Sequence, residues 1–181
     1  MNSDVTKSAQ VSAVIILLVI PCLSAIGADW KTFASRGGWS ISYPADWRIG
    51  SCQSCTDPTA EDVFVDFFPP SLKTADGWVM VSPLARRPSD ISVDAWLAKV
   101  SREANLNPHV HEAESKVNGL SALRVRYRSP QGEMEEIYVV SGSRTFSVSF
   151  SADPGSPGTS LETLPNYPIY SKMFRSFRVK R

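Results

Sequence analysis

The sequence has few of the residue types and motifs that most enzymes use for catalysis. It contains only two histidines and lacks a glycine-rich phosphate-binding loop. A "SGS" stretch at residues 141–143 lies in a tight hairpin pattern, without the strand-to-helix turn that hydrolase nucleophiles occupy. Pairs of carboxylates occur, but nothing singles them out. The sequence therefore predicts a protein that is not an enzyme, with no catalytic residues.

A surplus of charge of one sign is also lacking. The chain has 19 basic and 18 acidic residues and a formal net charge of +1. Proteins that bind nucleic acid usually carry a strongly basic face, so nucleic acid is not an expected partner. No internal repeat and no second domain boundary stand out, and a hydrophobic content of 43% is typical of a globular domain.

One long apolar run is present, and it is confined to the first 28 residues. Residues 11–28 are apolar apart from Pro21 and a few small polar side chains, Lys7 precedes them, and small residues close the run. A spanning helix needs about 20 apolar residues and usually a basic stop afterwards, whereas Asp29 follows here. We therefore predict a signal peptide over residues 1–28 and one domain over 29–181.

Export follows from this leader, and the protein is expected to be periplasmic or secreted. An uncleaved anchor is the alternative, and membrane contact would then occur only through the leader. Lipidation at Cys22 is not favoured, because Pro21 stands where lipoprotein signals need a small residue. Cleavage removes Cys22 and leaves an even pair of cysteines.

That pair, Cys52 and Cys55, lies in the stretch "GSCQSCTD". We interpret it as a structural disulfide, since thiols outside the cytoplasm tend to be oxidised. A redox centre is the first alternative, but such motifs usually open a helix near a βαβ unit, and this stretch is turn-like with Pro58 close behind. Half of a zinc site is the second, although a full site needs two further ligands.

The two histidines, His109 and His111, are the candidate metal ligands. Two residues apart on a strand, they would point to the same side, with Glu112 or Glu114 nearby. A solvated His-x-His is the more ordinary explanation. No cofactor is predicted.

Apolar periodicity predicts strands, one helix, further strands and a last helix. Val93, Trp96, Leu97 and Val100 form a helical stripe, with Ser92 as the N-cap. Asn118-Gly119 is a strong hairpin signal. Pro168 suits the first turn of a last helix. Its inner face is expected to carry Ile169, Met173, Ser176 and Phe177, with Tyr170 and Phe174 beside them. Antiparallel strands with segregated helices indicate an α+β class.

Three arginines, Arg124, Arg126 and Arg128, share one face of a predicted strand. If Arg128 pairs with Glu133 across the "SPQG" turn, Arg126 lies opposite Glu135, and the arginines are cross-strand charge partners. An anion-binding role for the arginines, and an apolar pocket lined by aromatic residues, are the alternatives.

The stretches "SISYPADWRI" (40–49) and "YSKMFRSFRV" (170–179) resemble the end signatures of the PsbP-like family. The element order between them matches too, so the resemblance covers nearly all of residues 29–181. It implies an antiparallel β-sheet sandwiched between helices, in a usually non-enzymatic protein that assists a larger assembly. No residue set matches the metal sites of the photosystem branch, and the Cys52–Cys55 stretch is not part of the family pattern.

We therefore expect an exported, non-catalytic accessory or interaction protein that docks on a protein partner in the cell envelope. The alternative is a small-ligand or metal-binding periplasmic protein. An exposed hydrophobic patch would favour docking, whereas a pocket with convergent polar groups would favour ligand binding.

Overall fold

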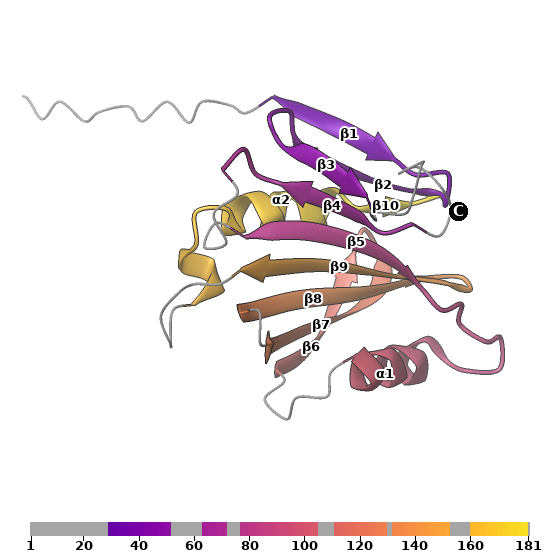
Figure 1. Ribbon diagram of the computed structural model, residues 1–181. Helices are drawn as coiled ribbons and strands as arrows, with labels where there is room; N and C mark the ends of the chain where they lie inside the picture. Colours follow the sequence, from indigo (N-terminus) through magenta and orange to yellow (C-terminus); the bar gives the residue numbers. More distant parts are fainter. Residues whose placement is uncertain are drawn as a thin grey trace, which may run out of the picture.

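The described part of the chain forms two antiparallel sheets, two α-helices and one short 3-10 helix (Figure 1). The computed structural model describes residues 29–51, 63–71, 77–104, 111–129, 132–152 and 160–180. The strands are β1 (Trp30–Ala34), β2 (Trp39–Pro44), β3 (Arg48–Ser51), β4 (Val65–Phe68), β5 (Trp78–Leu84), β6 (His111–Val117), β7 (Leu120–Ser129), β8 (Gly132–Ser141), β9 (Arg144–Ala152) and β10 (Arg178–Val179). The helices are α1 (Val93–Ala104), η2 (Leu161–Thr163) and α2 (Tyr167–Ser176).

The larger sheet has seven strands in the order β3-β4-β5-β9-β8-β7-β6, and the smaller has three in the order β1-β2-β10. Asn118 and Gly119 form the β6–β7 hairpin with φ angles of 51° and 81°, the left-handed conformation that a tight hairpin turn requires. The Asn118 side chain donates to the carbonyls of Arg175 (3.2 Å) and Phe177 (2.6 Å). The turn thereby fixes the end of α2 over the β6–β7 corner.

One side of the larger sheet, called here the α2 face, carries Val81, Ile137, Val148 and Phe150 and holds most of the core. Both α2 and the smaller sheet pack against it. Tyr170 stacks on Phe150 with ring centroids 5.1 Å apart. Each large apolar side chain buried here contributes about 1.5–3 kcal/mol relative to its exposed state, so this layer supplies most of the driving force for folding.

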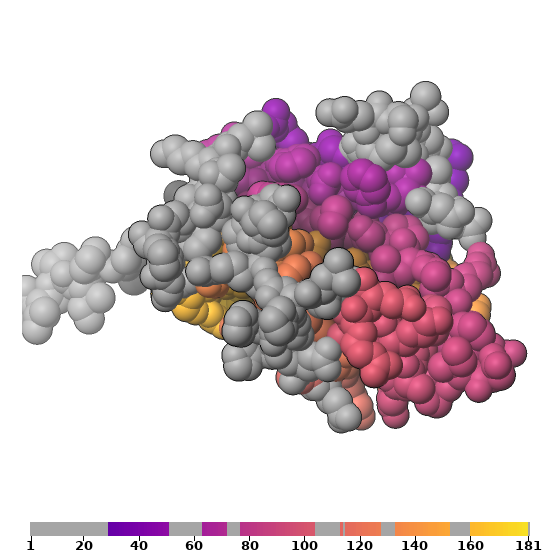
Figure 2. Space-filling model, turned by 60° about the horizontal axis from the view of Figure 1, so that its bottom comes forward, coloured from indigo at the N-terminus to yellow at the C-terminus, as the bar shows by residue number. Residues whose placement is uncertain are grey.

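The opposite side, called here the α1 face, is covered over β7 and β8 by α1. Trp96 and Leu97 pack on Val125 and Tyr138, and the Trp96 indole donates to the Thr145 hydroxyl at 2.7 Å. Figures 1 and 2 show α1 at the surface beside residues 85–92. The two helices therefore lie on opposite sides of the larger sheet.

The predicted α+β class is confirmed, as are the first helix and the N-cap at Ser92, whose hydroxyl accepts the backbone N–H of Ala95 at 3.2 Å. The finer expectation of one sheet between helices is not confirmed, because a second sheet shares the α2 face. That sheet joins the two ends of the described chain: β10 pairs with β2 at Ser40. Such distant pairing leaves no trace in local periodicity.

The last helix agrees with the prediction in part. It begins at Tyr167, so Pro168 lies in its first turn as expected, and Met173 and Phe177 are buried as expected. The other buried residues of the helix are Tyr167 and Tyr170. Ile169 is only partly buried. The larger aromatic side chains of Tyr167 and Tyr170 take the inner positions because they pack against Phe150.

No helix within the described ranges combines the length and the apolar character that crossing a bilayer requires. The predicted signal peptide, residues 1–28, lies outside those ranges.

Candidate functional site: an arginine–glutamate network beside a groove

A buried carboxylate, that of Glu135, lies at the centre of a polar network on the α2 face. Strand register puts Glu135 opposite Arg126, as the sequence predicted, and Arg124 diagonally from it. Glu135 Oε2 accepts hydrogen bonds from Arg124 Nη2 and Arg126 Nε, each at 2.6 Å, and from the Tyr167 hydroxyl at 3.0 Å. Glu135 is 1% exposed, so three donors on one oxygen offset the cost of burying its charge.

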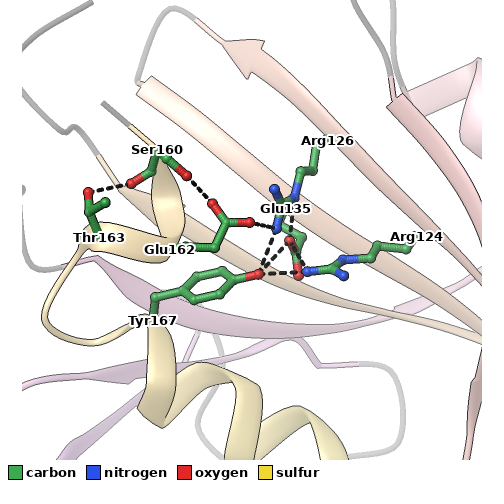
Figure 3. Close-up of polar contacts among 7 residues, drawn as sticks. All are labelled: Arg124, Arg126, Glu135, Ser160, Glu162, Thr163 and Tyr167. Carbon is green, nitrogen blue, oxygen red and sulfur yellow. Dashed lines mark hydrogen bonds and ion pairs between the residues drawn. The ribbon is translucent and has the colours of Figure 1, made fainter. Parts of the chain in front are cut away.

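Tyr167, the first residue of α2, joins the two arginines. Its hydroxyl accepts from Arg124 Nη2 at 2.6 Å and from Arg126 Nη2 at 2.7 Å, while it donates to Glu135 (Figure 3). Its ring packs edge-on against Phe150 with the centroids 5.8 Å apart. Packing of the ring therefore holds the hydroxyl where the three charged groups meet.

A second carboxylate, Glu162 on η2, closes the network from the side. It pairs with Arg126 and accepts a hydrogen bond from the Ser160 hydroxyl (Figure 3). The Ser160 bond, together with Arg126, lowers the pKa of Glu162 to about 2. For Arg126, burial opposes the charged form, but the neighbouring Glu135 and Glu162 carboxylates raise the pKa overall. Two arginines thus face two carboxylates, and the network is neutral.

A groove of about 490 Å³ lies beside this network. One wall is α2 and the other consists of β6, β7 and β8. The lining includes the network residues Arg124, Glu135, Glu162 and Tyr167, the apolar or aromatic residues Ile137, Tyr170 and Phe174, and Ser115, Lys116, Ser171 and Arg175. The volume falls within the range of small-molecule sites, roughly 300–1,000 Å³.

Two buried polar atoms of the groove residues have no hydrogen-bond partner within the described chain: the Tyr170 hydroxyl and Arg124 Nε. Tyr170 is 1% exposed, and burial, followed by the nearby Glu135 carboxylate, raises the pKa of its hydroxyl well above the usual value. The hydroxyl therefore keeps its proton at physiological pH. A buried donor without an acceptor costs about 1–3 kcal/mol, so both atoms favour an acceptor in the groove.

A second polar cluster lies on the α1 face. Glu136 accepts from the Tyr138 hydroxyl at 2.7 Å and from the Tyr127 hydroxyl at 3.2 Å. Strand pairing places Ser149 opposite Glu136, Met80 opposite Ser149 and Asp66 opposite Met80, so Asp66 lies on the same face as Glu136. Burial raises the pKa of Asp66 to about 6.

The other residues singled out from the sequence are not part of this site as far as the structure describes them. Cys52, Cys55 and His109 lie outside the described residues, and of His111, which begins β6, only the backbone is described. Within the described ranges, no three His, Cys, Asp or Glu side chains gather as metal ligands would. The disulfide and the histidine metal site remain predictions.

Sequence reasoning missed Tyr167, Tyr170 and Glu162. The alternation in "EMEEIYVV" could have shown that Glu135 points the same way as Ile137 and Val139, and hence into the core. Nothing in the sequence shows that a helix starting about 30 residues later brings a tyrosine to that carboxylate.

Comparison with known proteins relates the chain to others by structure alone. No protein-family model matches it, and no curated protein matches it at a significant level. Among solved structures, it is similar to the cyanobacterial PsbP protein CyanoP from Synechocystis, with a TM-score of 0.55 and 14% identity over 87% of this chain and 96% of that one.

Two further structures are more distant. One, from Bacteroides thetaiotaomicron, gives a TM-score of 0.49 and 15% identity over 83% of this chain and 48% of that chain. The other is LpqN from Mycobacterium tuberculosis, described as involved in cell envelope biogenesis, with a TM-score of 0.40 and 15% identity over 86% of this chain and 88% of that one.

The described part of the chain is therefore an antiparallel α+β arrangement with two α-helices. More particularly, it is the PsbP-like fold, as the resemblance in the sequence implied.

Proposed function

We propose that the protein is an exported, non-catalytic accessory protein that binds a small ligand in the groove between α2 and the seven-stranded sheet. The observation that carries the proposal is the convergence of polar groups from β6, β7, β8, η2 and α2 on one groove. Within the described ranges, the large hydrophobic side chains that are exposed are Ile49 and Phe64. The groove thus favours ligand binding over docking through a broad apolar patch.

The bonding of the network supports binding rather than catalysis. Glu135 Oε2 already accepts from three donors, and the Tyr167 hydroxyl is bonded to three charged groups. A general acid or base must be able to reach a proton on the substrate. Groups engaged in this way position one another and shape the groove instead.

The proposal also covers the cell compartment in which the protein works and the kind of partner it serves. The leader over residues 1–28 and the PsbP-like fold support a protein that works outside the cytoplasm. We propose that the domain serves a protein partner in the cell envelope and that Cys52 and Cys55 form a disulfide there. Fractionation of the native host, with thiol labelling before and after reduction, tests both points; a cytoplasmic protein with free thiols contradicts them.

Ligand binding is tested by NMR with a library of small anionic, cationic and neutral compounds. Binders should shift the amide resonances of Ser115, Arg124, Ser171 and Arg175 around the groove. The amides of Lys99 and Glu103, on the exposed side of α1, should stay unchanged and serve as the internal control. If no compound of any charge shifts the groove amides, the proposed function is wrong.

A further inference from the structure

We infer that the groove binds an organic anion, whose carboxylate or phosphate accepts hydrogen bonds from the Tyr170 hydroxyl and Arg124 Nε. The inference rests on the proposed function, and it adds the chemical class of the ligand and the two atoms that recognise it.

The first step is the charge of the groove. The network of Arg124, Arg126, Glu135 and Glu162 is neutral, so its carboxylates do not repel an anion strongly. Lys116 on β6 and Arg175 on α2 line the groove in addition. Both are exposed, and neither has an ion-pair partner within the described chain. Among the described residues they therefore add two positive charges to the groove, which attract an anion.

The second step is the pair of unpartnered donors. Arg124 uses Nη2 for Glu135 and Tyr167, whereas its Nε is buried and unpaired. The Tyr170 hydroxyl is likewise buried and makes no hydrogen bond of normal geometry to a protein atom, although the Glu135 carboxylate lies near enough to interact with it. Arg124 Nε can only donate, and the protonated Tyr170 hydroxyl can donate beside it, so a ligand group that accepts satisfies both atoms. Hydrogen bonds from an arginine to an anion are roughly twice as strong as neutral ones, and burial of the donor away from bulk water strengthens them further.

The third step is the apolar lining. Ile137, Tyr170 and Phe174 line the groove beside the charged groups. They provide contact for an aromatic or aliphatic body, which an inorganic ion lacks. The expected ligand therefore combines an acidic group with an apolar part.

The full chain, without its leader if that is cleaved on export, is titrated with phenylbutyrate, phenyl phosphate, neutral phenylbutyramide and inorganic phosphate. Phenylbutyrate or phenyl phosphate should bind at least about tenfold more tightly than the amide, equivalent to about 1.4 kcal/mol, and the better of the two identifies the acidic group. Inorganic phosphate should bind most weakly. Affinity should fall as salt is added, because the attraction is screened.

Tyr170→Phe is the sharpest variant, since it removes the hydroxyl and keeps the ring that stacks on Phe150. It should weaken anion binding about tenfold but leave the free protein at least as stable as the original, because the hydroxyl has no protein partner of normal hydrogen-bond geometry to lose. Arg124→Lys should weaken binding similarly. Lys99→Gln, on the exposed side of α1, is the matched charge control and should have no effect.

Equal binding of phenylbutyrate and phenylbutyramide at the groove amides would overturn the anion assignment and leave the proposed ligand groove standing. A Tyr170→Phe protein that binds the anion normally, or that is clearly less stable when free, would overturn the role of the hydroxyl. If none of these probes binds but a cationic or other library compound shifts the groove amides, the anion assignment is overturned and the ligand groove stands; if no library compound binds either, the proposed function itself is wrong.

Discussion

Glu135 and Glu136 are neighbours on β8, both are buried, and their side chains lie on opposite faces of the seven-stranded sheet. Glu135, on the α2 face, is held by two arginines and a tyrosine and borders the groove. Glu136, on the α1 face, accepts from the hydroxyls of Tyr127 and Tyr138. The same residue type is thus buried by two different means a single residue apart.

The difference shows what each face is suited to. Around Glu136 the carboxylate accepts from both tyrosine hydroxyls. Burial, and then Glu136, raise the pKa of Tyr127, so this tyrosine stays protonated. Around Glu135 the charges balance, but Tyr170 and Arg124 retain unpaired donors. A closed polar cluster stabilises the sheet, whereas a cluster with spare donors beside a groove is suited to binding.

Removal of the Glu135 charge should have the greatest effect on stability. Glu135→Gln leaves Arg124 and Arg126 without the central carboxylate, and should lower the free energy of unfolding by about 3 kcal/mol, the lower end for breaking a buried ion pair. The lower end applies because the arginine side chains are 39% and 32% exposed, so water partly replaces the lost partner. Guanidinium denaturation measures the loss.

Glu136→Gln is the matched control on the same strand. The glutamine carbonyl can still accept from Tyr138 and Tyr127, so we expect a loss of only about 1 kcal/mol, the surplus of a charged over a neutral hydrogen bond. Equal losses in the two variants would mean that the arginines add nothing to the burial of Glu135.

The next effect concerns Asp66, on the α1 face. Burial raises its pKa from 3.8 to about 6, so the folded protein keeps this proton where the unfolded chain releases it. Stability contributed by Asp66 is therefore present below about pH 4 and is lost as the pH rises through about 6. Asp66→Asn should be more stable than the original at pH 7 by about 1 kcal/mol, after allowance for the half-buried position of the side chain.

Denaturation curves between pH 3 and pH 8 test this expectation. The two proteins should converge below about pH 4, where Asp66 is protonated in both the folded and the unfolded state. A constant difference across the range would show that the substitution acts through packing and not through the charge.

Sequence reasoning predicted the parts of the site that depend on neighbouring strands. Arg126 lies opposite Glu135 because a short turn fixes the register of β7 and β8, and alternation then assigns each side chain to a face. Asn118-Gly119 fixed the β6–β7 hairpin in the same way. Turn residues and the two-residue period of the strands are therefore enough to predict strand register and the face on which each side chain lies.

The groove could not be predicted, because it forms where distant segments meet. Tyr167 bonds to Glu135, 32 residues earlier, and Ser176 binds the backbone of Ser42, 134 residues earlier. The helical pattern showed that α2 would bury one side, but not that the buried side would hold two tyrosine hydroxyls next to a carboxylate. Packing between layers, and not periodicity, decides which polar atoms converge.

Glu162, beside the groove, has a pKa shift opposite in sign to that of Asp66, and its substitution should change stability least. Its hydrogen bond with Ser160, and then Arg126, lowers its pKa from 4.5 to about 2. The stability it contributes is therefore present above about pH 4.5 and is lost as the pH falls through about 2. Since its side chain is 45% exposed, Glu162→Gln should cost only a few tenths of a kcal/mol at pH 7.

Denaturation curves at pH 7 and near pH 2 measure the difference in free energy of unfolding between Glu162→Gln and the original protein, which should disappear near pH 2. The difference for Asp66→Asn has the opposite sign and should disappear already below about pH 4. A small loss identifies Glu162 as a weakly held partner of Arg126 at the edge of the groove. A loss as large as that of Glu135→Gln would instead make η2 an integral part of the buried network, and the neutral charge balance around Arg126 would then be needed for folding itself.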